Sequence, residues 1–344
     1  CLGVNADVLK LLQNEVKVII NCAAVVSFDA SLDVALNLNT LGPLRVLEFA
    51  AGCVDPMVAH VSTCYVSGIR EGLVDEEPLD PSNALSGKNV ISDPYDVDRE
   101  VAELTRVVRR VEARSRSPWR KMVLSLATHF QVNGRGSAGT NGVQLLERLR
   151  REWVEQRLVT EGMRRAKYRG WNDTYTFTKA MGEQMIMRHR GDLPMVIFRP
   201  AIIESAFETP EPGWLDGLRM VDPLIVAYGR RQITEFPVAR SSISDIVPVD
   251  MTVNALLAAI PKAHQEGGCE IYQLATGDEN PLTYEGLCDL LYDYFQRESL
   301  GRRRVATKEI PYNTFPTVGS FLRRIRYRYI IPLRILEILG LLVS

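Results

Sequence analysis

The sequence predicts an α/β fold: a doubly wound parallel sheet with a helical insertion and a smaller C-terminal helical domain. Short apolar runs have the character of strands buried on both faces. Segments with helical spacing alternate with these runs, which is typical of parallel sheets covered by helices. The 344 residues, 46% of them hydrophobic and 24% charged, suffice for a large core. The same composition excludes a disordered chain, a collagen-like chain and a disulfide-stapled mini-protein.

Four segments are expected to be strands of this sheet, because each is a short run rich in apolar and β-branched residues. They are residues 16–24, 57–66, 195–199 and 270–275. Helical spacing predicts helices near residues 31–51, 97–116, 143–167, 174–190, 245–260 and 284–298.

The alternation of strand and helix breaks between about residues 76 and 169, where a Pro/Ser/Asn-rich loop precedes two Arg/Glu-rich helical patterns. We interpret this stretch as an insertion packed beside the sheet. From about residue 267 the pattern becomes helical and basic. We therefore expect a sheet domain over residues 1–266 and a smaller, incomplete helical domain over 267–344.

A glycine-rich phosphate loop of the kind that opens dinucleotide-binding sheets is missing from the sequence. The nearest glycine cluster, at residues 133–136, has no apolar strand before it, and we expect it to be a loop. The sequence begins with Cys1 and not with Met, so we expect it to be a fragment whose phosphate-binding strand lies upstream.

Tyr175 and Lys179 are the strongest candidates for chemistry. Asn172 or Asp173 can cap a helix that begins here, and residues four apart then share one helix face. A lysine ammonium beside a phenol favours the phenolate, so we expect Lys179 to lower the pKa of Tyr175 and suit it to acid/base work. The alternative is an ordinary helix surface.

The residues after the second predicted strand are also candidates, because sites of open α/β sheets form at the carboxyl ends of strands. A hydroxyl from Thr63, which the spacing to Gly68 favours over Ser62, could donate to a carbonyl oxygen. A plain strand-end turn is the alternative. Cys64 suits a small buried residue better than a nucleophile.

Asn39 lies on the apolar face of its predicted helix, where a polar side chain needs a partner. Pro43, four residues later, has no N–H to offer the Asn39 carbonyl oxygen, which is therefore left free. A helix kink without function is the alternative interpretation.

The formal net charge of −1 hides an asymmetry, since residues 301–344 carry nine Arg or Lys against two Glu. This basic end could meet phosphates or an acidic membrane surface, or could simply be a solvated face. The adjoining apolar stretch, residues 330–343, is too short to span a bilayer. Six cysteines without a Cys-x-x-Cys pair and four histidines without ligand spacing argue against a metal site and favour a reducing, cytoplasmic setting.

Six strings of this sequence, in the same order, resemble the alcohol-forming fatty acyl-CoA reductases of the bacterial, male-sterility type, within the extended short-chain dehydrogenase/reductase superfamily. They are residues 20–24, 60–66, 170–179, 199–205, 212–214 and 246–250. The resemblance runs from about residue 2 to residue 260 and implies a Rossmann-like fold with NADPH as the cofactor. It also implies reduction of a long-chain acyl-CoA to the aldehyde and on to the alcohol. We expect no nucleic-acid partner, and contact with a membrane only at its surface, through the basic end.

The resemblance assigns the expected catalytic residues. Tyr175 would donate the proton, Lys179 would bind the ribose and tune the phenol, Thr63 would stabilise the oxyanion, and Asn39 would carry a water linked to Lys179. The residues it places along the dinucleotide, besides Tyr175 and Lys179, are Asn21, Ala23, Ala24, Arg199 and Pro200.

Two other functions remain open from the residues alone. The first is a nucleotide-sugar epimerase or dehydratase of the same superfamily, against which the Pro-Gly-Trp string at 212–214 and the apolar C-terminal end argue. The second is a non-catalytic scaffold that binds lipid or a partner through its basic end, against which the Tyr, Lys and Thr set argues.

Overall fold

The computed structural model describes residues 3–70, 72–79, 95–132, 140–218, 221–298 and 314–335. The chain forms two compact units. The first comprises Cys1–Ala201 and Val253–Leu274, and the second comprises Ile202–Thr252 and Ala275–Ser344. Each unit is assembled from two separate stretches of chain, and the expected domain border at residue 266 stays a prediction.

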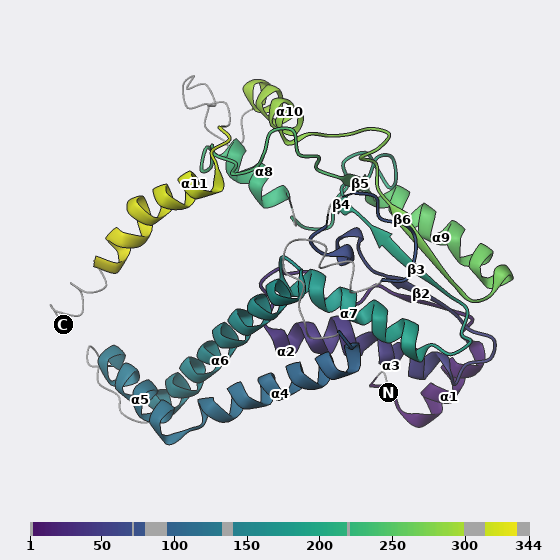
Figure 1. Ribbon diagram of the computed structural model, residues 1–344, viewed down its shortest axis with the longest axis horizontal. Helices are drawn as coiled ribbons and strands as arrows, with labels where there is room; N and C mark the ends of the chain where they lie inside the picture. Colours follow the sequence, from purple (N-terminus) through teal and green to yellow (C-terminus); the bar gives the residue numbers. More distant parts are fainter. Residues whose placement is uncertain are drawn as a thin grey trace. The chain divides into compact units, whose positions relative to one another are not determined.

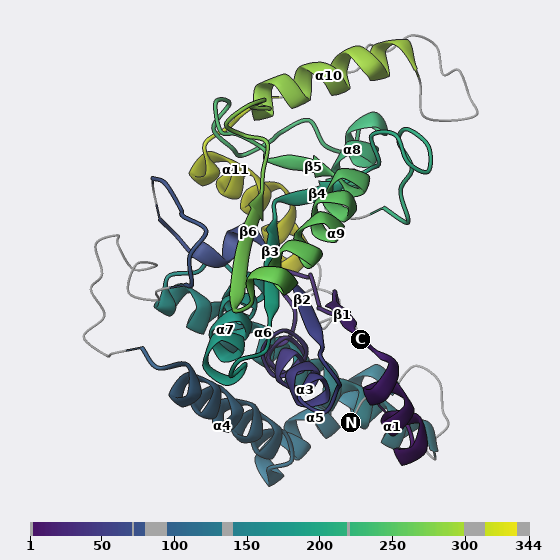
Figure 2. The same cartoon turned by 90° about the vertical axis from the view of Figure 1, so that its right-hand side faces the viewer.

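The first unit is built on a four-stranded sheet with the order β1-β2-β3-β6, in which every neighbouring pair is parallel (Figure 2). Asn21 pairs with His60, so the carboxyl ends of β1 and β2 lie side by side. The strands are β1 (Val18–Asn21), β2 (Met57–Val61), β3 (Met195–Pro200) and β6 (Cys269–Leu274).

Helices cover both faces of this sheet (Figure 1). On one face, Leu256 and Ile260 of α9 (Val249–Glu266) pack against Ala59 and Phe198. On the other face, α3 (Leu41–Ala50) and α7 (Thr174–His189) pack against the alternate residues of the same strands. The predicted doubly wound parallel sheet is thereby confirmed.

The first helix of the chain is α1 (Ala6–Glu15). A short helix α2 (Leu32–Ala35) continues through a π-helical turn (Leu36–Thr40) into α3, and a 3₁₀ turn (Cys64–Ser67) follows β2.

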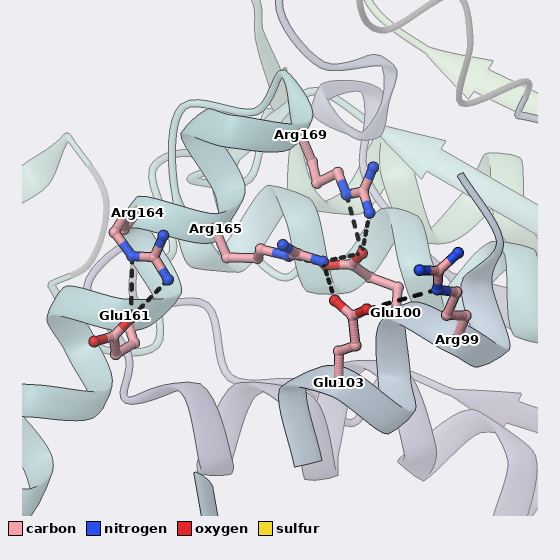
Figure 3. A network of polar contacts seen from close by, with 7 residues as sticks. All are labelled: Arg99, Glu100, Glu103, Glu161, Arg164, Arg165 and Arg169. Atoms are coloured by element: carbon pink, nitrogen blue, oxygen red, sulfur yellow. Dashed lines mark hydrogen bonds and ion pairs between the residues drawn. The ribbon is translucent and has the colours of Figure 1, made fainter. Parts of the chain in front are cut away.

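The described part of the insertion contains the helices α4 (Val97–Ser115), α5 (Pro118–Val132) and α6 (Thr140–Arg169). Leu104 and Leu158 are among the buried residues that pack α4 against α6. Figure 3 shows the polar contacts between the same two helices, where Arg165 and Arg169 of α6 pair with the buried carboxylate of Glu100. Two of these helices agree with the predicted patterns, whereas α5 was not foreseen. The glycine cluster at 133–136 lies outside the described residues.

The second unit contains a parallel pair of short strands, β4 (Ile202–Glu204) and β5 (Ile246–Pro248). Its helices are α8 (Asp222–Gly229), α10 (Tyr284–Arg297) and α11 (Val318–Ile325), and α11 continues into a π-helical turn (Arg326–Ile330). Tyr228 and Phe295 pack α8 against α10, with their ring centroids 6.1 Å apart. Among the helices that the structure describes, none has the length and apolar character needed to cross a membrane.

Candidate active site

The candidate site lies where the carboxyl end of β2 meets the beginning of α7. Asp173 caps α7, because its carboxylate accepts a hydrogen bond from the Thr176 amide at 2.8 Å. Trp171, just before this cap, donates its indole N–H to the carbonyl oxygen of Val66 at 2.9 Å. The turn after β2 and the start of α7 are therefore held together, and Thr63 and Tyr175 come from these two segments.

The Thr63 side chain lies close enough to the Tyr175 phenol to act on its pKa. Burial raises the pKa of Tyr175 to about 12, and the interaction with Thr63, which favours the phenolate, acts in the opposite direction. The expectation that Lys179 lowers this pKa is wrong, because the pKa is raised and Lys179 is not among the groups that shift it. The reason is that the Lys179 ammonium donates elsewhere, and burial of the phenol dominates.

Lys179 is 2% exposed, and its Nζ donates to the Val61 carbonyl oxygen at 2.6 Å. Burial lowers the pKa of Lys179 to about 8, while the charges of Glu183 and Cys22 raise it. Within the described residues this is the single hydrogen bond of an ammonium group that has three donors. The remaining donors suit the hydroxyl groups of a ribose, so the residues present fit the nicotinamide–ribose part of a dinucleotide.

Glu183, which the sequence reasoning missed, forms a buried ion pair with Arg199. The Arg199 guanidinium contacts both carboxylate oxygens, the closest at 2.7 Å, and also donates to the Glu77 carbonyl oxygen at 3.0 Å. The Nε and Nη2 groups of Arg199 are thus engaged by Glu183 and Glu77. Glu183 lies four residues after Lys179 on the same face of α7, and this spacing is the signal that could have revealed it.

The backbone at Arg199 and Pro200 closes β3 beside the turn after β2. The Cys64 thiol donates to the Arg199 carbonyl oxygen at 3.0 Å, and Pro200 is the last, buried residue of β3. This contact gives the Cys64 thiol a packing partner, but the side chain is only half-buried and not the buried residue that was expected.

Asn39 is buried and holds the segment that follows β1. Its amide oxygen accepts from the Val25 amide at 2.9 Å, and its amide nitrogen donates to the Val25 carbonyl oxygen at 3.0 Å and to the Thr178 hydroxyl at 3.1 Å. Thr178 is the neighbour of Lys179 on α7. Asn39 therefore connects the loop after β1 to α7.

Asn21, at the end of β1, shapes the loop that contains Ala23 and Ala24. Its amide oxygen accepts from the Ala23 amide at 3.3 Å, and its amide nitrogen lies 3.1 Å from Nδ1 of His60. His60 is fully buried, and burial, together with the charge of Lys179, holds its pKa well below the usual value. His60 is thus a neutral partner that orients Asn21, a role that the sequence did not indicate.

The first unit is thus a doubly wound parallel sheet in which Tyr175 and Lys179 of α7 lie beside the strand-end hydroxyl of Thr63, the arrangement of a dinucleotide-binding fold. Residues 1–256 match the NAD-binding family described as Male sterility protein, and the chain belongs to that family.

Relatives with curated names are fatty acyl-CoA reductases. Fatty acyl-CoA reductase 2, chloroplastic, of Arabidopsis thaliana is 37% identical over 86% of this chain and 43% of its own length. The alcohol-forming fatty acyl-CoA reductase of Simmondsia chinensis is 29% identical over 94% of this chain and 59% of its own. The chain spans 43–62% of the length of the first five curated relatives.

Among solved structures, the terminal R domain of the myxalamid PKS-NRPS pathway is similar in fold, with a TM-score of 0.49 and 16% identity. The alignment covers 86% of this chain and 51% of that one.

Proposed function

We propose that this chain provides the catalytic site of an NADPH-dependent reductase that converts long-chain fatty acyl-CoA to the aldehyde and then to the alcohol, releasing CoA. The observation that carries the proposal is the placement of the Tyr175 and Thr63 side chains beside each other, with buried Lys179 one helical turn along α7. The names of the relatives support the substrate class and, for the Simmondsia protein, the alcohol product.

The two hydroxyl groups of the site suit the carbonyl oxygen of a thioester. Tyr175, with a pKa of about 12, keeps its proton at neutral pH and can pass it to an oxygen that becomes negatively charged. Thr63 adds a second donor to the same oxygen, which is the arrangement that stabilises an oxyanion. When bound, the dinucleotide supplies the hydride.

The chemistry requires two reductions at the same carbon. Hydride and proton addition to the thioester gives a hemithioacetal, whose C–S bond then breaks to release CoA as a thiol and leave the aldehyde. A second hydride and a second proton convert the aldehyde to the alcohol. Tyr175 is the proton donor in both reductions, and its proton must be replaced between them.

The identity of the cofactor as NADPH is part of the proposal, since membership of an NAD-binding family does not distinguish NADPH from NADH. We also propose a cytoplasmic enzyme that contacts a membrane at its surface. The support for this contact is α11 with its continuation, where Arg323, Arg324, Arg326 and Arg328 accompany exposed Leu322 and Tyr329.

The test is a turnover assay of the full-length protein with palmitoyl-CoA and either NADPH or NADH. We expect oxidation of NADPH in step with release of free CoA thiol, and hexadecanol as the final product. A nucleotide-sugar epimerase would instead interconvert UDP-sugars and leave the acyl-CoA untouched. If NADPH is not oxidised with any long-chain acyl-CoA, the proposed function is wrong.

A further inference from the structure

A cavity of about 490 Å³ lies within the helical insertion, where α4, α5 and α6 meet. Its lining includes three arginines and two tryptophans together with Ser117: Arg114, Arg120, Arg157, Trp119 and Trp153. Figure 1 shows α5 at the end of the paired helices α4 and α6. No residue of the candidate active site takes part in this lining.

The cationic groups of the cavity are poorly neutralised. Among the residues that the structure describes, no carboxylate lines the cavity, and Arg114 and Arg120 form no ion pair, while Arg157 is paired with Glu161 at 2.8 Å. The surrounding charge has the same sign, since residues 97–169 contain 17 Arg and Lys against 8 Asp and Glu. The net positive charge of this region would therefore attract an anion toward the cavity before it contacts any side chain.

The aromatic groups restrict what can bind. The guanidinium carbon of Arg120 lies 4.3 Å from the centre of the Trp153 ring, so the flat face of the guanidinium is occupied by stacking. Its N–H donors, which lie along the edge, remain directed outward. The Trp119 side chain is 67% exposed, so much of the indole is accessible to a ligand in the cavity.

We propose that this cavity is a binding site for a phosphate group, held by Arg114, Arg120 and Arg157, with the indole of Trp119 covering the part of the ligand next to the phosphate. Arginine is the side chain best suited to this task, because its planar fork of donors matches the oxygens of a phosphate. The phosphate can belong to a soluble nucleotide or to a lipid headgroup, both of which present the same group. The site is separate from the proposed reductase chemistry and does not depend on it.

The experiment measures binding to the full-length protein by tryptophan fluorescence, to which Trp119 and Trp153 contribute. Three probes are compared: inorganic phosphate, adenosine bisphosphate, and a short-chain phosphatidate below its micelle concentration. The test variant is the double substitution Arg114→Gln and Arg120→Gln. The matched control is Arg106→Gln with Arg109→Gln, which removes the same charge from exposed positions of α4 outside the cavity.

We expect the wild-type protein to bind phosphate and at least one larger probe, and the test variant to bind the preferred probe about 100-fold more weakly, because two charge-assisted hydrogen bonds are lost. The control variant should keep its affinity within about threefold, as expected for screened surface charges. Preference for the nucleotide or the phosphatidate identifies the source of the phosphate. The proposal is overturned if the wild type binds none of the probes, or if the test and control variants bind equally. Thermal unfolding of both variants verifies that the insertion remains folded.

Discussion

Gly182 of α7 faces the carbonyl oxygen of Asn39 so closely that a β carbon at position 182 would lie 2.2 Å from that oxygen. The Asn39 carbonyl is available for this approach because Pro43 has no N–H and the chain forms a π-helical turn there. The backbones of two helices therefore touch next to Lys179. This close approach helps to fix the distance between α7 and the sheet.

The first prediction is that Gly182→Ala destabilises the protein, because the added methyl group must push the two helices apart. Overpacking of this kind costs about 1–3 kcal/mol, and it should lower the midpoint of thermal unfolding. The matched control is Gly319→Ala in α11, where a β carbon would meet nothing within 4 Å. An unfolding midpoint that is the same for both variants would show that the close approach does not matter.

The second prediction concerns the buried pair of Glu183 and Arg199, whose side chains are 2% and 1% exposed. Glu183→Gln leaves the guanidinium buried without its counter-charge, which costs about 3–5 kcal/mol. The comparison is Glu285→Gln, which breaks the exposed pair with Arg240 and should cost about 0–1 kcal/mol. Equal free energies of unfolding for the two variants would refute the structural role given to Glu183.

The third prediction is that the affinity for the dinucleotide decreases as the pH rises through about 8, the pKa to which burial lowers Lys179. The ammonium form is the one that binds, and it is present below this pKa and lost above it. We expect the dissociation constant to rise by about tenfold for each pH unit beyond that point. Lys179→Met should bind weakly at every pH, with a flat profile. If the wild type also has a flat profile between pH 7 and 10, the ribose-binding role of Lys179 is wrong.

The fourth prediction is that replacing Arg323, Arg324, Arg326 and Arg328 by Gln releases the protein from anionic vesicles. Each arginine near such a surface contributes about 1 kcal/mol, and α11 also has exposed apolar side chains. Vesicle sedimentation measures the effect, and acyl-CoA kinetics are recorded in parallel. An increased KM for acyl-CoA with unchanged sedimentation would mean that the arginines bind CoA phosphates. If neither KM nor sedimentation changes, the four arginines belong to an ordinary solvent-exposed face and the membrane proposal is wrong.

The architecture of the sheet could be predicted from the sequence because buried parallel strands are short and apolar throughout. All four predicted strands are present, but the second, expected over 57–66, ends at Val61. The following residues have strand-like side chains, yet Thr63 caps a 3₁₀ turn there. The cap that the Thr63 side chain provides, and not the apolar pattern, therefore decides where that strand ends.

Other features depend on information that a local pattern does not contain. The strands β4 and β5 have three residues each, too few for a period to be seen. The helix α5 is an exception, because it begins with Pro118, a local start signal from which the helix could have been predicted. The ion pair of Glu183 joins residues on two elements, and the neutral state of His60 follows from its burial against Asn21. Both require the folded chain.

In the candidate site, too, some features follow from the local sequence and others only from the folded chain. Tyr175, Lys179 and Thr63 could be selected from spacing and from their position after predicted elements, and the structure brings Tyr175 and Thr63 into contact. The direction in which the pKa of Tyr175 shifts could not be predicted from the sequence. It depends on how much water reaches the phenol and on where the lysine donates its hydrogen bond, and both are properties of the tertiary structure.

The most direct test of the account is the rate of palmitoyl-CoA reduction by Tyr175→Phe, measured beside NADPH affinity in the full-length protein. Removal of the phenol oxygen deletes the proton donor and keeps the ring that packs against Phe28. We predict a fall in kcat of about 10²–10⁴-fold, the usual contribution of a general acid, with a nearly unchanged dissociation constant for NADPH. A variant that reduces palmitoyl-CoA at the wild-type rate would contradict the assignment of Tyr175 as the acid, and with it the proposed mechanism.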